Sequence, residues 1–410
     1  MYSSPNSSYH TVAVIGGGAS GIMAALTAAM EPGRHVVLFE RQQRIGRKLL
    51  ATGNGRCNLT NIMAVPEDYY GDDAAFARTA LSLFTPHDTL RFFSDLGLLT
   101  VTEADGRVYP LSDSSNSVLD VLRFALARAG VEQICGTPVD AIVPVGSGFR
   151  VQYGEASLDA DAVIMACGGA AGSKLGGVMD GYRLGKALGH RRTSLYPSLT
   201  RIVTDSDYPR SLKGIRVQAG LRLTRGEALL SEGRGEIQFT EKGVSGPAGF
   251  NLSRAVSTGG AGLVLHLALL PYQRGDLMEL LLRRVQKFPE IEASELFTGM
   301  LHNRLGRVLV KAAGLPLAVP LSELSPQQLL RAASVCADFA LPVTGVEGFE
   351  AAQVTAGGLH TSQFDRLSLE SRLVPGLFAC GELLDIDGPC GGYNLQWAWA
   401  SGALAGRLGQ

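Results

Sequence analysis

A glycine-rich turn between an apolar strand and an Ala-rich helix dominates the start of the chain. Residues Val12–Ile15 are apolar or β-branched and predict a buried strand. Gly16, Gly18 and Gly21 follow it in G-x-G-x-x-G spacing, and a helical run extends from about Ala19 to Met30. In this setting the spacing is typical of a dinucleotide-binding turn, with a diphosphate at the helix N-terminus. A glycine-rich turn of an ordinary α/β domain is the alternative.

Each glycine of the turn has a mechanical role in that interpretation. Gly16 makes the tight turn, Gly18 lets a pyrophosphate approach the backbone, and Gly21 lets helix and strand pack closely. A second apolar strand, Val36–Phe39, ends at Glu40, which lies 24 residues after Gly16. A carboxylate at that place is expected to bind ribose hydroxyls, and its charge would repel the 2′-phosphate of NADP.

Length, composition and charge limit the kinds of function that the chain can have. The 410 residues leave room for two or three domains. With 37 basic and 38 acidic residues the chain has no electrostatic footprint for nucleic acid, so we expect no nucleic-acid partner. No apolar run is long enough for a bilayer, and the N-terminus lacks a secretory pattern. Six scattered cysteines without C-x-x-C favour a reducing compartment and predict no metal site. We therefore expect a cytoplasmic protein.

Four segments are expected along the chain. Residues 1–194 predict the first part of a nucleotide-binding domain, and the alternating strands and turns of 195–271 predict a small antiparallel barrel or sandwich. Residues 272–340 have a helical pattern, and residues 341–410 return to the style of the first segment. The middle of the chain is therefore interpreted as an insertion with a β part and an α part.

Short strands follow one another between residues 131 and 166. The stretches VEQIC, VDAIVPV and FRVQY are parted by Gly and Pro, and predict a β-meander rather than another βαβ unit. Ala162–Ala166 predict a buried strand that ends in Cys167, Gly168 and Gly169. Small residues at a strand end allow a ligand to approach the backbone closely.

A second candidate ligand-binding edge lies near the C-terminus. A strand over residues 376–379 ends in Cys380–Gly381–Glu382, and Gly391–Gly392 open a final helix that begins at Tyr393. Gly381 permits backbone contact, and Glu382 can bind a ribityl hydroxyl or a phosphate-bound water. A helix N-terminus carries a charge of roughly +0.5, which would stabilise negative charge on the pyrimidine side of a flavin.

A basic stretch follows Glu40. It contains Arg41, Arg44, Arg47, Lys48 and Arg56, and no Asp or Glu occurs from residue 41 to residue 66. This stretch suits a bound diphosphate, and a solvated basic face is the alternative.

Several of these motifs together resemble a known class. The segments VAVIGGGASG…VVLFE, the strand that ends in CGG, and GLFACGELLDIDG resemble the FAD-binding domain of glutathione-reductase-like flavoproteins. More narrowly, GRKLLATGNGRCNLTN, GRVYPLSD, GYRLGKALGH, FTEKGVSGPAGF and ACGELLDIDGPCGGYNLQWAWASG are similar to the BaiN/YhiN-like (aminoacetone-oxidase-like) family of FAD-dependent oxidoreductases. The resemblance implies an α/β fold: a Rossmann-type FAD-binding domain from both chain ends, with an inserted β-barrel-like subdomain and a helical subdomain.

The resemblance also implies contacts to FAD. Gly16, Gly18, Ala19, Ser20 and Gly21 would contact the pyrophosphate, Glu40 the adenosine ribose with Arg41 beside it, and Val139 the adenine. Along the pyrophosphate and the ring would lie Lys48, Asn54, Arg56, Cys57 and Asn58. Gly381 and Glu382 would bind ribityl and phosphate, and Asn394 and Leu395 the flavin O2 and N1. Gly168, at the strand end, is a further candidate contact. Two departures from the family pattern bear on substrate preference: Glu241 stands where many relatives have His, and the segment after Gly358 is short and weakly acidic.

No catalytic residue is identified from the sequence. Tyr393 is a candidate proton donor, and Cys390 and Cys57 are candidate thiols, with simple packing as the alternative for each. No C-x-x-x-x-C occurs, which excludes a disulfide-reductase mechanism. No second G-x-G-x-x-G with a downstream acid occurs either, so NAD(P)H would act as a transient donor, or another donor would reduce the flavin.

The leading hypothesis is an FAD-dependent oxidoreductase that transfers a hydride between flavin and a small organic substrate, with reduction or desaturation of a C=C bond as the specific reaction. An oxidase that passes electrons from a small amine to oxygen is a second hypothesis. A non-catalytic flavin-bound regulatory or scaffolding protein is a third.

Overall fold

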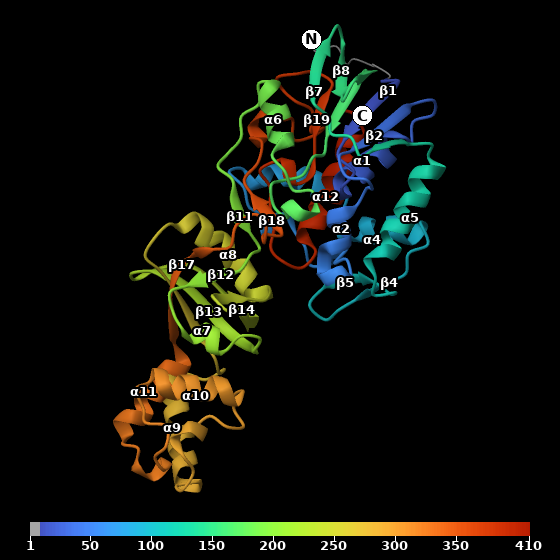
Figure 1. Cartoon of the computed structure of the whole chain (residues 1–410). Coiled ribbons are helices and arrows are strands. Elements are labelled where there is room, and N and C mark those ends of the chain that lie inside the picture. The colour runs from blue at the N-terminus through green and yellow to red at the C-terminus, as the bar shows by residue number, and fades with distance from the viewer. Residues whose placement is uncertain (1–8) are drawn as a thin grey trace. The chain divides into compact units, whose positions relative to one another are not determined.

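Both ends of the chain form one unit of the structure, and the middle of the chain forms another. The computed structural model describes residues 9–410 (Figure 1). The first unit runs to Tyr196 and resumes at Gln353, whereas the second comprises Pro197–Ala352. The unit therefore resumes later than the predicted residue 341. The reason is that β17 (Phe339–Val346) completes the barrel of the second unit.

A five-stranded parallel sheet is the centre of the first unit. Its order is β19-β10-β1-β2-β6, and every neighbouring pair is parallel. The strands are β1 (Thr11–Ile15), β2 (His35–Glu40), β6 (Glu132–Cys135), β10 (Ala162–Met165) and β19 (Leu377–Ala379). The chain continues from β1 to β2 on one side and later returns to β10 on the other. In such sheets ligands bind outside the carboxyl ends of the strands at this switch point.

One strand lies elsewhere than the sequence predicted. The VEQIC stretch was expected in the meander, but β6 pairs in parallel with β2 at the sheet edge. The 14-residue helix α5 (Ser115–Arg128) precedes β6 and supplies the crossover that a parallel neighbour requires. The meander therefore contains only β7 (Ala141–Val145), β8 (Gly148–Tyr153) and β9 (Ala156–Ala160).

Two helices pack closely beside the sheet. These are α1 (Ala19–Ala28) and α12 (Tyr393–Gly406), the first and last helices of the chain. A Cβ on Gly402 would lie 2.4 Å from the carbonyl oxygen of Ser20, so the two helix backbones meet without a side chain between them. The blue and red segments of Figure 1 therefore share one core.

The other elements of the first unit are short. They are α2 (Arg47–Ala51), α3 (Arg78–Leu83), α4 (Pro86–Asp95), α6 (Asp180–Ala187), β3 (Thr60–Asn61), β4 (Thr100–Thr102), β5 (Arg107–Pro110) and β18 (Val354–Ala356). Strands β3, β5 and β4 form a small antiparallel sheet, in that order.

A closed antiparallel barrel forms the β part of the second unit, with the order β12-β15-β14-β13-β16-β17. The strands not yet placed are β11 (Tyr196–Ser198), at the chain's entry to this unit, and β12 (Ile202–Thr204), β13 (Arg216–Arg225), β14 (Ala228–Phe239), β15 (Gly243–Ser245) and β16 (Leu263–Ala268). Buried and partly exposed side chains alternate along β16, where Leu263, Leu265 and Leu267 are the buried ones.

Helices α7 (Tyr208–Ser211), α8 (Pro247–Gly259), α9 (Arg274–Lys287), α10 (Asn303–Ala312) and α11 (Pro326–Ala337) complete the second unit. Its barrel and helices share a single hydrophobic core. The predicted fold class is thus confirmed. Within residues 9–410, no helix combines the length and apolarity needed to cross a membrane.

Candidate functional site

The glycine turn after β1 is shaped by steric contacts that only glycine permits. Gly16 has φ +115°, and a Cβ there would lie 2.4 Å from the carbonyl oxygen of Ala166. A Cβ on Gly21 would lie 1.8 Å from the carbonyl oxygen of Gly16. Gly18 differs, because a Cβ there would meet nothing within 4 Å. The turn therefore leaves open space directly before the N-terminus of α1, where N–H groups have no intrahelical acceptor.

Glu40 is held at the end of β2 by this turn. Its carboxylate accepts hydrogen bonds from the backbone N–H of Gly17 (2.9 Å) and of Gln42 (2.7 Å). Burial raises the pKa of Glu40, while these hydrogen bonds and the nearby Arg41 act in the opposite direction. Each carboxylate oxygen keeps a second lone pair that can accept from a ligand hydroxyl. Arg41 itself forms a half-exposed ion pair with Asp180 (2.9 Å).

The two chain ends meet at the next strand end. Lys48 Nζ lies 2.7 Å from Glu382 Oε2, across 334 positions of sequence. The other oxygen, Oε1, accepts a hydrogen bond from the N–H of Thr355 (2.8 Å). Gly168, at the end of β10, has φ +71°, and a Cβ there would meet nothing within 4 Å. The predicted residues Lys48 and Glu382 are therefore together, and Gly168 adds a second open position.

Gly381 has a packing role. Its φ is +69°, and a Cβ would lie 2.4 Å from Ser20 Oγ. Its N–H donates to Ser401 Oγ (2.9 Å), and its carbonyl accepts from Trp397 Nε1 (3.0 Å). Because these backbone groups are already paired with α12, Glu382 is the member of the Gly–Glu pair that can contact a ligand.

Asn394 shapes the loop that leads into α12. Its Oδ1 accepts from the N–H of Gly388 (2.9 Å), and its Nδ2 donates to the carbonyls of Gly388 (2.7 Å) and Pro389 (3.2 Å). At this terminus the N–H of Gln396 donates to the carbonyl of Gly392 (3.0 Å). The backbone N–H groups of Asn394 and Leu395 are therefore the groups that suit an anionic or carbonyl oxygen.

The segment after α2 contains three of the predicted contacts. Asn54 and Cys57 have φ of +57° and +63°, so the backbone here is tightly folded. The guanidinium of Arg56 lies 3.8 Å from the ring centroid of Tyr109. It also bonds to the carboxylates of Asp113 and Glu103. The charge of Arg56 is therefore balanced within the protein.

Asn58 and Ala19 complete the predicted contacts around the two helix starts. The Asn58 side-chain amide lies against Gly392 at the start of α12. Ala19 is the first residue of α1, directly after the open position at Gly18.

All three candidate catalytic groups keep their protons at neutral pH. Cys57 is fully buried, and burial raises the pKa of its thiol to about 12. Burial also raises the pKa of Cys390 and of Tyr393. A thiolate role is therefore disfavoured for both cysteines, because the thiolate is the nucleophile. The Tyr393 hydroxyl remains able to donate a proton.

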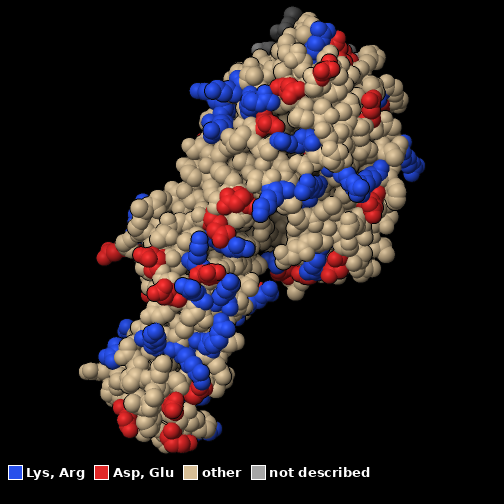
Figure 2. Space-filling view, viewed as in Figure 1, with Lys and Arg blue, Asp and Glu red and all other residues tan. Residues whose placement is uncertain are grey.

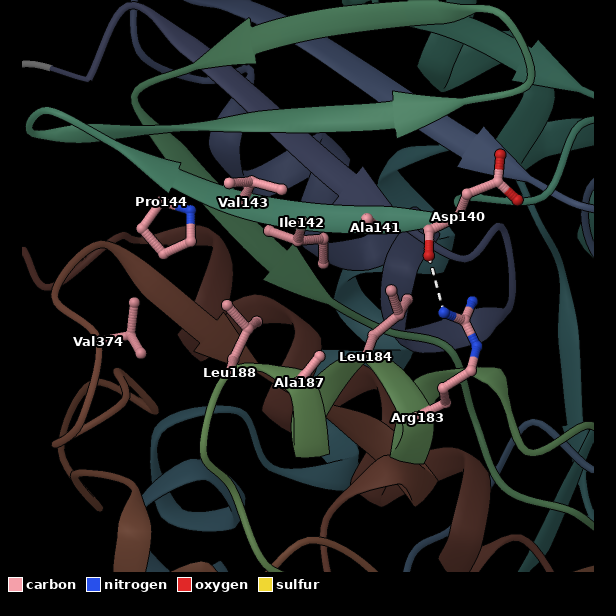
Figure 3. A pocket seen from close by; sticks show the side chains of 10 residues that line it. All are labelled: Asp140, Ala141, Ile142, Val143, Pro144, Arg183, Leu184, Ala187, Leu188 and Val374. Atoms are coloured by element: carbon pink, nitrogen blue, oxygen red, sulfur yellow. Dashed lines mark hydrogen bonds between the residues drawn. The ribbon is translucent and has the colours of Figure 1, made fainter.

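Sequence reasoning missed Arg183, which lies beside the predicted adenine contact. Its Nη2 and Nη1 donate to the carbonyls of Val139 (3.4 Å) and Asp140 (2.7 Å). Arg183 also lines one end of a groove of about 400 Å³ between β7 and α6 (Figure 3). The groove is mainly apolar, with Ile142, Leu184 and Val374 among its side chains, and none of the predicted FAD contacts lines it.

Arg107 and Thr355 were also missed. Arg107 begins β5, and its Nε lies 3.2 Å from where a Cβ on Gly391 would be. Thr355 donates its N–H to Glu382, and its Oγ1 accepts from the N–H of Ala171 (2.9 Å). In the sequence, Asp105–Gly106–Arg107 is explained by the turn of a hairpin. That local explanation gave no sign that Arg107 lies near Gly391.

The residues present suit an FAD molecule. Open space lies at Gly18 and Gly168, an acid lies at the end of β2, and the chain-end pair Lys48–Glu382 lies beside Gly169, the residue after Gly168. Residues 10–408 match the model of the HI0933-like protein Rossmann domain. The chain belongs to the HI0933-like family.

Curated relatives cover nearly all of this HI0933-like chain. The 3-dehydro-bile acid delta(4,6)-reductase of Clostridium scindens is 38% identical over 97% of the chain and 98% of its own length. The ribosomal RNA dihydrouridine synthases of Escherichia coli and Haemophilus influenzae are 28% and 26% identical, over 95% and 96% of the chain and 95% and 97% of their own lengths. The chain is thus an FAD-dependent oxidoreductase, as predicted. The expectation of no nucleic-acid partner stays a prediction.

Proposed function

We propose that the protein reduces a carbon–carbon double bond conjugated to a carbonyl group. The observation that carries this proposal is the chain-length match, at 38% identity, to a protein named as a delta(4,6)-reductase of a 3-dehydro-bile acid. The other relatives are named for dihydrouridine, which is uridine with one ring double bond saturated. The two names share a chemistry in which a C=C bond beside a carbonyl gains two hydrogens.

The bound FAD supplies the hydride chemistry, and the chain binds it and sets its surroundings. In this proposal the turn from Gly16 to Gly21 receives the pyrophosphate, and Glu40 holds the adenosine ribose. Lys48 orients Glu382 toward the ribityl chain through their 2.7 Å contact. The N–H groups of Asn394 and Leu395 would donate to the pyrimidine end of the ring.

Tyr393 is the proposed proton donor. Addition of hydride to a conjugated C=C bond leaves negative charge on the carbon beside the carbonyl, and a proton must follow. The pKa of Tyr393 is raised chiefly by burial, so its hydroxyl is protonated through the neutral range. Its ring is half buried against Tyr69, with ring centroids 6.3 Å apart, which limits its orientation.

NAD(P)H is the proposed electron donor. The chain has a single G-x-G-x-x-G turn with a downstream acid, and FAD uses that turn in this proposal. A nicotinamide donor would therefore bind transiently and leave before the substrate is reduced.

A uridine of ribosomal RNA is the second candidate substrate, because two chain-length relatives carry that activity in their names. We rank a small enone before RNA as the substrate, because the bile-acid reductase has a higher sequence identity to this chain than the two synthases have. The face seen in Figure 2 shows Lys and Arg side chains interspersed with Asp and Glu, without an extended one-signed surface. The charge distribution on this face therefore gives no support to RNA as the substrate.

An anaerobic flavin assay separates these candidates. The purified yellow protein is reduced with NADH or NADPH, and its flavin absorbance is followed after addition of a 3-oxo-4-ene steroid or of unmodified ribosomal RNA. Flavin reoxidation with a product heavier by two hydrogens identifies the substrate class. Reoxidation only by oxygen, with stoichiometric hydrogen peroxide and steady turnover of an amine, would instead identify an oxidase.

A further inference from the structure

A cation lies at the loop that opens α12. Arg107 is the first residue of β5, and its Nε is 3.2 Å from the position of a Cβ on Gly391. Its side chain is 25% exposed, and it pairs with Asp105 (3.2 Å), whose side chain is 54% exposed. Water therefore screens the carboxylate of the pair more strongly than it screens the guanidinium.

Buried contacts fix this cation relative to the helix start. Asn61 is 3% exposed, and its Nδ2 donates to the carbonyls of Gly391 (3.1 Å) and Asp105 (3.4 Å). A Cβ on Gly392 would lie 2.4 Å from the backbone of Thr60. The β4–β5 turn and the loop before α12 are thus joined through Thr60 and Asn61 of β3, which fixes the backbone of the turn beside Arg107 relative to Gly391.

The charge of Arg107 reaches the groups at this helix start. Burial raises the pKa of Cys390 and of Tyr393, and Arg107 acts to lower both. The carboxylate of Asp105 acts against Arg107 at both groups, and that of Asp68 does so at Tyr393. The partial positive charge of the α12 N-terminus has the same sign and the same location. The loop therefore combines a side-chain cation with a helix dipole.

We propose that Arg107 lies beside the pyrimidine end of the bound flavin and, with the N–H groups of α12, stabilises the negative charge that the ring gains on reduction. This inference rests on the proposed placement of the flavin at α12. Hydride transfer from a nicotinamide donor oxidises that donor to NAD(P)+ and leaves one extra negative charge on the pyrimidine side of the flavin. A nearby cation makes the flavin easier to reduce.

Two measurements on the FAD-loaded protein test this role without the organic substrate. The first is the midpoint potential of the flavin, and the second is the dissociation constant for sulfite, which adds to oxidised flavin and leaves a similar negative charge. Arg107→Met should weaken sulfite binding about tenfold, as expected for a partly exposed charge close to the ring. An equal weakening of reduction is a fall in potential of about 30 mV for a two-electron couple.

Three further variants distinguish charge from structure. Asp105→Asn removes the counter-ion and should shift both quantities in the opposite direction. Arg107→Lys keeps the charge and should restore most of both. Arg150→Met is the matched control, because Arg150 forms an Arg–Asp pair with Asp159 (2.7 Å) on the separate β7–β9 sheet. That control should leave both quantities unchanged.

The proposal is overturned if Arg107→Met retains FAD and matches Arg150→Met in potential and sulfite affinity. If Arg107→Met does not fold, Asp105→Asn decides, since an unchanged potential there also overturns it. If the variants show these shifts but the wild-type protein turns over neither enone nor RNA, the proposed reaction is contradicted and the role of Arg107 stands. A colourless wild-type protein would contradict both.

Discussion

The two glycine-containing helix starts of the first unit are built in different ways. At α1 the turn is determined by backbone collisions, since Gly16 and Gly21 sit against carbonyl oxygens. At α12 the loop is determined by side-chain hydrogen bonds, chiefly from Asn394 and Asn61. Each start combines a local contact with a distant one: Gly21 meets Gly16 and Gly16 meets Ala166 at α1, whereas at α12 Asn394 bonds to Gly388 and Asn61 bonds to Gly391. A substitution at Gly16 or Gly21 should therefore act on folding, and one at Tyr393, the first residue of α12, on the chemistry.

The largest expected effect is at Gly21. In Gly21→Ala the new Cβ would lie 1.8 Å from the carbonyl oxygen of Gly16, so helix and turn must separate. We expect a loss of about 3 kcal/mol or more in unfolding free energy, together with loss of bound flavin. Thermal unfolding and the flavin-to-protein absorbance ratio measure this.

Gly18→Ala is the matched control for that substitution. Its Cβ enters open space, so the protein should fold normally while FAD binds more weakly. Equal thermal stability of Gly21→Ala and the wild type would contradict the steric account of the α1 start.

Removal of the Tyr393 hydroxyl should have the next largest effect. Tyr393→Phe should lower the rate of substrate reduction about 100-fold, because general-acid catalysis is lost, while flavin reduction by the donor continues. In the wild type the raised pKa keeps the donor protonated, so activity should fall only as the pH rises above the usual tyrosine range. Stopped-flow measurement of the two half-reactions across pH tests this.

Tyr69→Phe serves as its control. That variant loses the hydrogen bond from Tyr69 to the carbonyl of Tyr393 (2.9 Å) and should lose stability without changing the pH profile. If both variants keep the wild-type rate of substrate reduction, another group supplies the proton.

The sequence predicted the α1 start better than the α12 start for a physical reason. The spacing of Gly16, Gly18 and Gly21 reports a local geometry, and the structure shows the matching close contacts and open space. At α12 the resemblance implied Asn394 as a ring contact without naming the group involved, and the structure shows that its side-chain amide bonds to Gly388 and Pro389. The contact to the ring stays a prediction, for the backbone N–H. A side-chain role that depends on a folded loop is not visible in residue spacing.

The sequence placed two strands less well for a related reason, because their pairing partners lie far away along the chain. The stretch from residue 132 to residue 135 is too short to show a period, and its partner is decided by the helical crossover before it. Strand β17 closes the barrel after more than 60 residues of mainly helical segment, so its sequence position suggested the first unit. The presence and type of both units were nevertheless predicted.

The Lys48–Glu382 contact, which joins the two chain ends, should give a moderate effect. Lys48→Met leaves a partly buried carboxylate without its cation, since the two side chains are 31% and 20% exposed. We expect FAD affinity to fall about tenfold, the effect of losing one charge-assisted hydrogen bond. Flavin fluorescence titration of the apoprotein measures the dissociation constant. Arg47→Met, on the same helix and exposed beside Gln42, should leave the dissociation constant unchanged.

Cys390 should give the smallest effect, although it lies next to the loop that opens α12. Its pKa is raised by burial, so the thiol carries no thiolate at neutral pH, and Cys390→Ala should leave both half-reactions nearly unchanged. Iodoacetamide should likewise fail to inactivate the folded enzyme at pH 7.5. Rapid inactivation that FAD prevents, and that the Cys390→Ala variant resists, would show that the cysteine contacts the ring and that side chains at α12 do more than shape the loop.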